Sequence, residues 1–211
     1  MLSATGLECV RGERRLFRDV GFELDPGTLL EVVGANGSGK TSLLRIVCGL
    51  LAPAAGAILW NGTDIAKLGE AFRGELTYLG HQNAIKDDLT AIENVVLPER
   101  LAGGNATDAT AREALAELGL AGFETLPTRV LSQGQKRRVA LARLAFRARC
   151  PLWVLDEPFV ALDMRAVANV ADMIANHVDS GGIVLLTTHQ VVEVACRRRE
   201  TLRLGAEAEA V

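Results

Sequence analysis

The segment Gly34–Thr41, with the sequence GANGSGKT, restricts the fold of this chain more than any other part of it. It matches the pattern G-x-x-x-x-G-K-[ST] and follows Thr28–Val33, a nearly continuous apolar run that is typical of a strand buried on both faces. A helix is predicted directly after it, over Thr41–Leu50. A buried strand, a glycine-rich loop and a helix in this order predict an α/β fold whose loop binds phosphate.

Each residue type in this loop suits phosphate binding. Glycines let successive backbone N–H groups turn toward phosphate oxygens, and the start of the helix directs its positive end at them. Lys40 adds a full charge near the β and γ phosphates, and the Thr41 hydroxyl is a candidate Mg²⁺ ligand. The predicted nucleotide-binding residues of the loop are Gly34, Ala35, Asn36, Gly37, Ser38, Gly39, Lys40, Thr41 and Ser42.

The hydrophobic pattern predicts further elements on both sides of the loop. Leu7–Val10 and Val20–Leu24 alternate like short antiparallel strands, and a turn at Asn61-Gly62 makes the preceding run a hairpin strand. The middle third is predicted to be helical, and the last third a parallel β-α-β unit. The remaining predicted elements are Ala57–Trp60 (strand), Thr107–Glu117 and Lys136–Arg149 (helices), Leu152–Leu155 (strand), Ala166–His177 (helix) and Ile183–Thr187 (strand).

Size and charge limit the organisation and the partners. The 211 residues are enough for one domain, which we expect to consist of a β-rich, loop-bearing part (1–80), a helical part (81–149) and a return to the core (150–211). A formal net charge of -3 disfavours nucleic acid as a partner. No apolar run reaches the roughly 20 residues that span a bilayer, and the amino terminus lacks the apolar core of a signal peptide, so we expect a cytosolic chain.

Two adjacent carboxylates follow the predicted strand Leu152–Leu155. Because ligands of an open parallel sheet lie at the carboxyl ends of its strands, Asp156 is expected beside an Mg²⁺ ion held at the phosphate loop. Glu157 is then placed to orient or deprotonate a water molecule that attacks the γ-phosphate. One carboxylate is enough for the metal, so the pair favours ATP hydrolysis over ATP binding alone.

The segment Leu131–Gln135, with the sequence LSQGQ, resembles the LSGGQ motif of ABC ATPases. Ser132 and Gly134 at a helix start offer a hydroxyl and free N–H groups, which form an anion site. A second phosphate site in one chain is redundant unless it serves the ATP of another chain. In ABC ATPases it does so, because two subunits face head to tail and enclose two ATP molecules. The resemblance therefore implies a P-loop nucleotide-binding domain of the ABC type, with a mixed sheet core, an antiparallel β subdomain and a helical subdomain. It also implies a second copy as partner and contacts to ATP from Ser132, Gly134 and Gln135.

Further matches to the family lie in the family's order between residues 34 and 189. Gln82 matches the glutamine that touches Mg²⁺ and ATP and links the core to the helical part. Asp163, in Ala161-Leu162-Asp163, matches the loop that crosses the dimer to the nucleotide. His189 matches the histidine that contacts the γ-phosphate, so the resemblance implies Glu157 and His189 as catalytic residues and Thr41, Gln82 and Asp156 as residues that hold the metal.

Two positions depart from the family pattern. Gln133 replaces the usual glycine of LSGGQ, and we expect function to persist because Ser132 and Gly134 remain. Alignment of Arg11–Phe17 places Arg11 where many members stack adenine on a tyrosine. A guanidinium can stack on the base in a different way, so Arg11 is the predicted adenine contact. Outside the motifs, His81 and His177 are expected to be structural, and Arg197-Arg198-Arg199 is expected to be a solvated face.

Finer strings resemble one branch of the family, the ATP-binding subunit of the haem exporter of bacterial cytochrome c maturation. They include Tyr78–Gln82, Gln135–Leu144, Thr187–Gln190 and, as the best single marker, Phe159 after Asp156-Glu157-Pro158. The resemblance implies polytopic membrane subunits as partners, a peripheral place on the cytoplasmic face of the inner membrane, and transport of haem or release of a haem chaperone adduct.

Other functions are weaker alternatives. An importer or multidrug ATPase of the same family differs only in the branch strings, and a non-transport ABC protein that acts on nucleic acid conflicts with the charge. A soluble phosphate-loop kinase or GTPase would need an acceptor pocket or the base-reading pattern Asn-Lys-x-Asp, which this sequence lacks.

Overall fold

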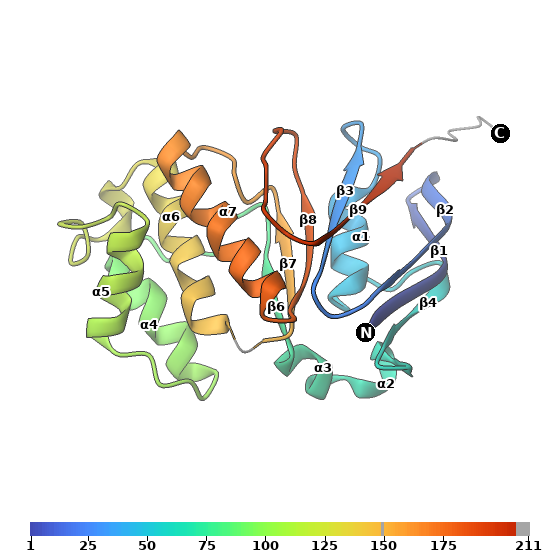
Figure 1. Ribbon diagram of the computed structural model, residues 1–211, viewed down its shortest axis with the longest axis horizontal. Coiled ribbons are helices and arrows are strands. Elements are labelled where there is room, and N and C mark those ends of the chain that lie inside the picture. The colour runs from blue at the N-terminus through green and yellow to red at the C-terminus, as the bar shows by residue number, and fades with distance from the viewer. Residues whose placement is uncertain (149, 206–211) are drawn as a thin grey trace.

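The computed structural model describes residues 1–148 and 150–205, in two sheets with helices packed around them (Figure 1). Arg149, the last residue of the predicted helical stretch, and residues 206–211, the end of the predicted third part, lie outside the described residues. The α/β fold class is confirmed, with a sheet core, an antiparallel β sheet and a helical part.

The core sheet is parallel and has the strand order β6-β7-β8-β3-β9. The strands β3, β7 and β8 are buried along almost their whole length, which explains their continuous apolar sequences. The β-α-β unit predicted for the last third is confirmed, since β7 pairs directly with β8. The bounds are β3 Thr28–Gly34, β6 Leu76–Leu79, β7 Leu152–Asp156, β8 Ile183–Thr187 and β9 Arg198–Leu204.

A second, antiparallel sheet has the order β2-β1-β4-β5 and lies beside α1 (Figure 1). The two amino-terminal strands are longer than predicted, because their hydrogen-bonded pairing continues to Leu2 and Leu24 at one end and to Arg11 and Arg14 at the other. The hairpin turn at Asn61-Gly62 is confirmed, and both residues have positive φ angles, 49° and 79°. The bounds are β1 Leu2–Arg11, β2 Arg14–Leu24, β4 Ala55–Trp60 and β5 Thr63–Asp64.

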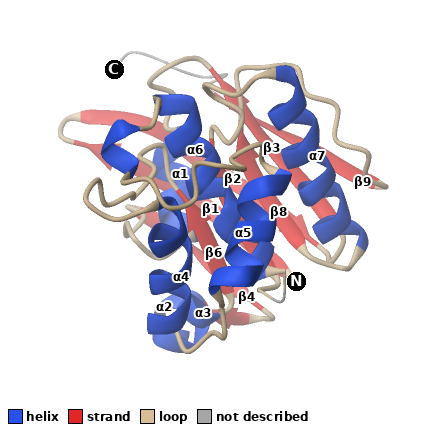
Figure 2. Cartoon of the chain, turned by 90° about the vertical axis from the view of Figure 1, so that its left-hand side faces the viewer, coloured by secondary structure: helices blue, strands red, loops and turns tan. Residues whose placement is uncertain are grey.

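Most helices of the middle third are inserted between the neighbouring strands β6 and β7, and Figure 2 shows them in front of the strands. The helix α5 begins and ends as predicted, with a capping box at Thr107 and a left-handed Gly119 after its end. The helices are α1 Lys40–Val47, α2 Ile65–Leu68, α3 Glu70–Gly74, α4 Ala91–Leu101, α5 Asp108–Glu117, α6 Gln133–Ala142 and α7 Met164–Asp179, with 3-10 turns at Thr128–Val130 and Arg143–Arg147.

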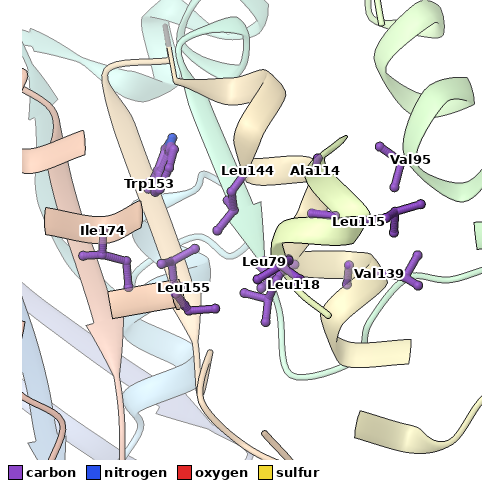
Figure 3. Packing of buried hydrophobic residues seen from close by; sticks show 14 of the residues in the cluster. Leu79, Val95, Ala114, Leu115, Leu118, Val139, Leu144, Trp153, Leu155 and Ile174 are labelled. Carbon is purple, nitrogen blue, oxygen red and sulfur yellow. The ribbon is translucent and has the colours of Figure 1, made fainter. Parts of the chain in front are cut away.

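The two faces of the core sheet are packed differently. Alternate residues of β7 point to opposite sides, so Trp153 and Leu155 join the cluster under α4–α7, while Leu152 and Val154 join the cluster under α1 and the antiparallel sheet. Figure 3 shows the first cluster, where Leu155 lies between Ile174 of α7 and residues of the helical part. The sheet is thus fixed from both sides, which holds the ends of its strands in place.

Several predicted elements needed correction. The helix predicted over Lys136–Arg149 begins three residues earlier, at Gln133, and becomes a 3-10 turn after Ala142. The helix α4 and the strands β6 and β9 had no prediction of their own. The run Arg197–Arg199 leads into β9, where Arg198 pairs with Asp25 (3.0 Å) and Arg199 with Glu31 (2.6 Å).

The four cysteines are free thiols, with Cys9 and Cys48 buried and Cys150 and Cys196 half-buried. Among the residues that the structure describes, no helix is both long enough and apolar enough to cross a membrane.

Candidate functional site

A cavity of about 750 Å³ opens at the carboxyl ends of β3, β7 and β8, where the phosphate loop and the two carboxylates meet. It brings together residues of five separate sequence segments, as the strand order predicts. Its lining residues are Arg11, Arg14, Leu16, Asn36, Gly37, Gly39, Lys40, Thr41, Ser42, His81, Asp156, Glu157, Val160, His189 and Gln190. A second cavity of about 380 Å³, between the end of α1 and α2–α3, has a mainly apolar lining and none of these charged groups.

The phosphate loop is held in shape by its own lysine. The Lys40 ammonium donates to the carbonyl oxygens of Gly34 (2.8 Å) and Ala35 (3.2 Å) across the loop. Gly39 precedes α1 with a φ angle of 100°, and a Cβ atom there would lie 2.9 Å from Phe17. No side chain caps the start of α1, so its first N–H groups are free for an anion in the cavity.

Asp156 is buried and oriented by Thr187, the last residue of the neighbouring strand. The Thr187 hydroxyl donates to Asp156 Oδ1 at 2.7 Å, whereas Asp156 Oδ2 is buried without a hydrogen-bond partner. An unpaired carboxylate oxygen at the wall of a phosphate cavity fits a divalent cation. Thr41 lines the same cavity, so Asp156 and Thr41 are a suitable pair of oxygen ligands for Mg²⁺.

Glu157 follows Asp156 and turns its carboxylate toward His189. The distance from Glu157 Oε1 to His189 Nε2 is 3.2 Å, and the glutamate side chain is 11% exposed whereas the histidine side chain is 52% exposed. The backbone of Glu157 has a φ angle of 52°, a left-handed conformation that costs a non-glycine residue on the order of 1 kcal/mol. The orientation of the Glu157 carboxylate toward His189 is therefore accompanied by local backbone strain.

Two arginines also line the cavity. They are Arg11, for which an adenine contact stays a prediction, and Arg14 of β2, with Leu16 beside them in the lining. His81, which we expected to be structural, also lines the cavity. His177 is buried against Trp153, with ring centroids 3.9 Å apart and parallel planes, and desolvation lowers the pKa of its imidazole to about 4.

Five residues implied by the family resemblance do not line the cavity. Gln82 is exposed next to His81, and Asp163 caps α7 by accepting from the Ala166 N–H at 2.8 Å. The other three lie at the start of α6, namely Ser132, Gly134 and Gln135. The nucleotide contacts predicted for these five residues are thus not formed within one cavity of a single chain.

The start of α6 is a complete capping box. The Ser132 hydroxyl accepts from the Gln135 N–H at 3.2 Å, and Gln135 Oε1 accepts from the Ser132 N–H at 2.8 Å. Gly134 is required by packing, because a Cβ atom there would lie 2.5 Å from the Ala161 carbonyl oxygen. The Gln133 side chain is exposed, so its replacement of glycine causes no crowding within the chain.

Sequence reasoning missed Thr187, Arg14 and a buried arginine of α6, Arg137, that contacts the backbone of both carboxylate residues. Thr187 had a detectable signal, because the paired ends of adjacent parallel strands place it opposite Asp156. Arg137 had none, since its partners lie between 19 and 57 residues away in the sequence.

Comparison with known proteins agrees with this geometry. The family model described as "ABC transporter" matches residues 17–160. The cytochrome c biogenesis ATP-binding export protein CcmA of Nitrosomonas europaea is 56% identical over 190 residues, which cover 90% of this chain and 89% of that protein. The protein of the same name from Dechloromonas aromatica is 53% identical and covers 97% of this chain and all of its own length, 100%.

Among solved structures, the ATP-binding subunit of an ABC transporter aligns with a TM-score of 0.82 at 27% identity, covering 97% of this chain and 88% of that one. The sheet order, the cavity and the sequence relatives lead to the same assignment. The chain belongs to the ABC transporter family, within the branch of cytochrome c biogenesis ATP-binding export proteins.

Proposed function

We propose that the chain hydrolyses ATP to drive a membrane complex that exports haem, or releases a haem chaperone adduct, for cytochrome c assembly. The observation that carries the hydrolysis is the single cavity that holds Lys40, Asp156 and the Glu157–His189 pair. The names of the relatives support the role in cytochrome c biogenesis and in export. Haem as the cargo follows from the resemblance to the haem exporter branch.

The residues of the cavity divide the work of hydrolysis. The Lys40 ammonium and the N–H groups at the start of α1 bind the phosphates. Thr41 and Asp156 would hold Mg²⁺, which would supply positive charge to neutralise the phosphates. Glu157 Oε1 orients the attacking water and accepts its proton as the water oxygen bonds to the γ-phosphorus and ADP leaves. His189 donates a hydrogen bond at the γ-phosphate.

A second copy of the chain is the proposed partner at the start of α6. Ser132 and Gln133 are exposed, and the capping box leaves the first two N–H groups of the helix without an acceptor within the helix. An exposed, positively polarised helix start that does not reach its own cavity suits the phosphates of another copy. In this arrangement Gln82, Ser132, Gly134, Gln135 and Asp163 act in the dimer.

The membrane subunits are the other proposed partners, and they would hold the chain on the cytoplasmic face of the inner membrane. Purification of the complex through a tag on this chain tests this. Copurification of cytochrome c maturation proteins with bound haem is the expected result, whereas a permease for another solute would refute the cargo assignment.

Replacing Glu157 by Gln tests the hydrolysis mechanism. The amide keeps the shape of the side chain and cannot accept a proton, so kcat for ATP in the purified complex is expected to fall by roughly 100-fold or more, with ATP affinity retained. An unchanged kcat would refute the role of Glu157 as base.

A further inference from the structure

Arg137 is a buried charge at the junction of three functional segments. It belongs to the first half of α6, and only 4% of its surface is exposed. One end of its guanidinium faces the carboxylate residues at the end of β7, and the other faces the segment that follows β6. A guanidinium is costly to bury unless its donors are used, so this position needs an explanation.

Among the described residues, the hydrogen bonds of Arg137 go to three backbone carbonyl oxygens and one side-chain amide oxygen, while its Nε is buried without a partner. Its Nη2 donates to the carbonyl oxygens of both Asp156 and Glu157 at 2.8 Å. Its Nη1 donates to the Gly80 carbonyl oxygen at 3.1 Å and to Asn83 Oδ1 at 3.0 Å. The planar fork thus joins the two segments with four hydrogen bonds, a geometry that a lysine cannot reproduce.

One of the residues that Arg137 binds, Glu157, has a strained backbone. Glu157 has a φ angle of 52°, and its N–H donates to the Thr187 carbonyl oxygen (3.2 Å) and the Thr187 hydroxyl (3.0 Å). Arg137 holds the carbonyl oxygens on the other side of the same turn. Glu157 is therefore held from both sides in a conformation that it would otherwise leave.

We propose that Arg137 is a positioning residue for hydrolysis, which fixes the Glu157 carboxylate and couples it to the start of α6 and to the segment 80–83. This inference rests on the proposed role of Glu157. Gln133, the first residue of α6, lies four residues before Arg137, and Gln82 lies between its two partners Gly80 and Asn83. A displacement of the start of α6 or of the segment 80–83 would therefore also shift the Glu157 carboxylate, because the planar guanidinium of Arg137 connects them.

The test compares two variants of Arg137 in the purified full-length complex. Arg137→Met removes the fork at similar length, and we expect kcat to fall about 10- to 100-fold with the Kd for ATP changed by less than about twofold. Arg137→Lys keeps the charge and one donor group, so an intermediate loss of about 3- to 10-fold is expected. If Arg137→Met does not fold, the lysine variant provides the measurement.

Arg147→Met is the matched control. Arg147 is a half-buried arginine of the helical part, with a 2.8 Å ion pair to Glu99. Among the described residues its side chain makes no hydrogen bond to β7, and only its backbone carbonyl oxygen accepts from Trp153. We expect its kcat to stay within about twofold of the wild type. An equal loss of kcat in the Arg147 and Arg137 variants, or a parallel loss of ATP affinity in the Arg137 variants, would overturn the proposal, because both results indicate general disruption.

A double variant separates this proposal from the proposed function. If Arg137 acts through Glu157, then adding Arg137→Met, or Arg137→Lys if only that variant folds, to Glu157→Gln costs less than about twofold further in kcat. A fully additive loss would refute the positioning role and leave Glu157 as the base. If Glu157→Gln alone has no effect, the proposed mechanism itself fails, and the positioning role fails with it.

Discussion

The chain contains two helix starts suited to phosphate, and they are built in opposite ways. The start of α1 has no side-chain cap, and its lysine, its loop, the two carboxylates at the end of β7 and His189 after β8 enclose a cavity around it. The start of α6 has a complete capping box and exposed residues, and its side chains contribute nothing to that cavity. The first start needs a ligand to satisfy its backbone donors, whereas the second is stable by itself and available to a partner.

The largest expected effect is on ATP affinity, when the lysine at each of these two helix starts is replaced. Lys40→Met removes a charge from the phosphate loop, and we expect the Kd for ATP to rise about 100-fold, measured by titration with a fluorescent ATP analogue. Lys136→Met is the matched change in α6, where Lys136 pairs with Asp87 at 2.6 Å. It should alter the Kd by less than about twofold. Equal losses would show that the two helix starts do not differ in the way proposed.

Acid should weaken the core that carries both helix starts. The folded chain holds the pKa of His177 at about 4, while the unfolded chain has the ordinary value of about 6.5. The unfolded state therefore binds more protons between these values, and the stabilisation present above pH 6.5 is lost as the pH falls toward 4.

At pH 5 the protonation of His177 is expected to lower the free energy of unfolding by about 1 to 2 kcal/mol relative to pH 7, which urea unfolding at the two pH values would measure. His177→Phe keeps a ring against Trp153 and cannot titrate, so its stability should change less between the two pH values. An identical loss in both proteins would contradict the assignment.

The smallest expected effect is on stability, when the capping residue of α6 or of α5 is replaced. Ser132→Ala removes the cap of α6 and should lower the free energy of unfolding by about 1 kcal/mol. Thr107→Ala removes the equivalent capping box of α5, with a similar loss expected. Only the Ser132 variant should also lower ATP hydrolysis by the assembled complex. If both variants hydrolyse ATP at the wild-type rate, α6 does not serve the nucleotide of a partner.

Elements with a strong local pattern were predictable from the sequence. The strands β3, β7 and β8 and the helices α5 and α7 have apolar periodicity and clear caps, so their positions agree with the prediction to within a few residues. The cavity residues of the phosphate loop, with Asp156 and Glu157, were predictable because they sit at strand ends of a parallel sheet, whereas His189 was predicted from the family resemblance.

Other features depend on contacts that a local pattern does not contain. The edge strand β9 begins with four polar residues, Arg198–Thr201, so the start of its sequence resembles a solvated charge run. Pro98 lies inside α4 and disfavours a helix prediction, yet packing against α5 and α6 maintains the helix. The capping pattern Ser132-x-x-Gln135 did contain the true start of α6, which a search for capping boxes would have found.

The place of β3 in the sheet has a consequence for the order of folding. This strand carries the phosphate loop, and its two neighbours are β8 and β9, which come last among the described strands. The pairing of Leu29 with Arg199 spans most of the chain, so both edges of β3 stay unpaired until residues 183–204 have been synthesised. A nascent chain thus acquires its nucleotide site only after residues 183–204 have been synthesised, and its loop strand is exposed to aggregation until then.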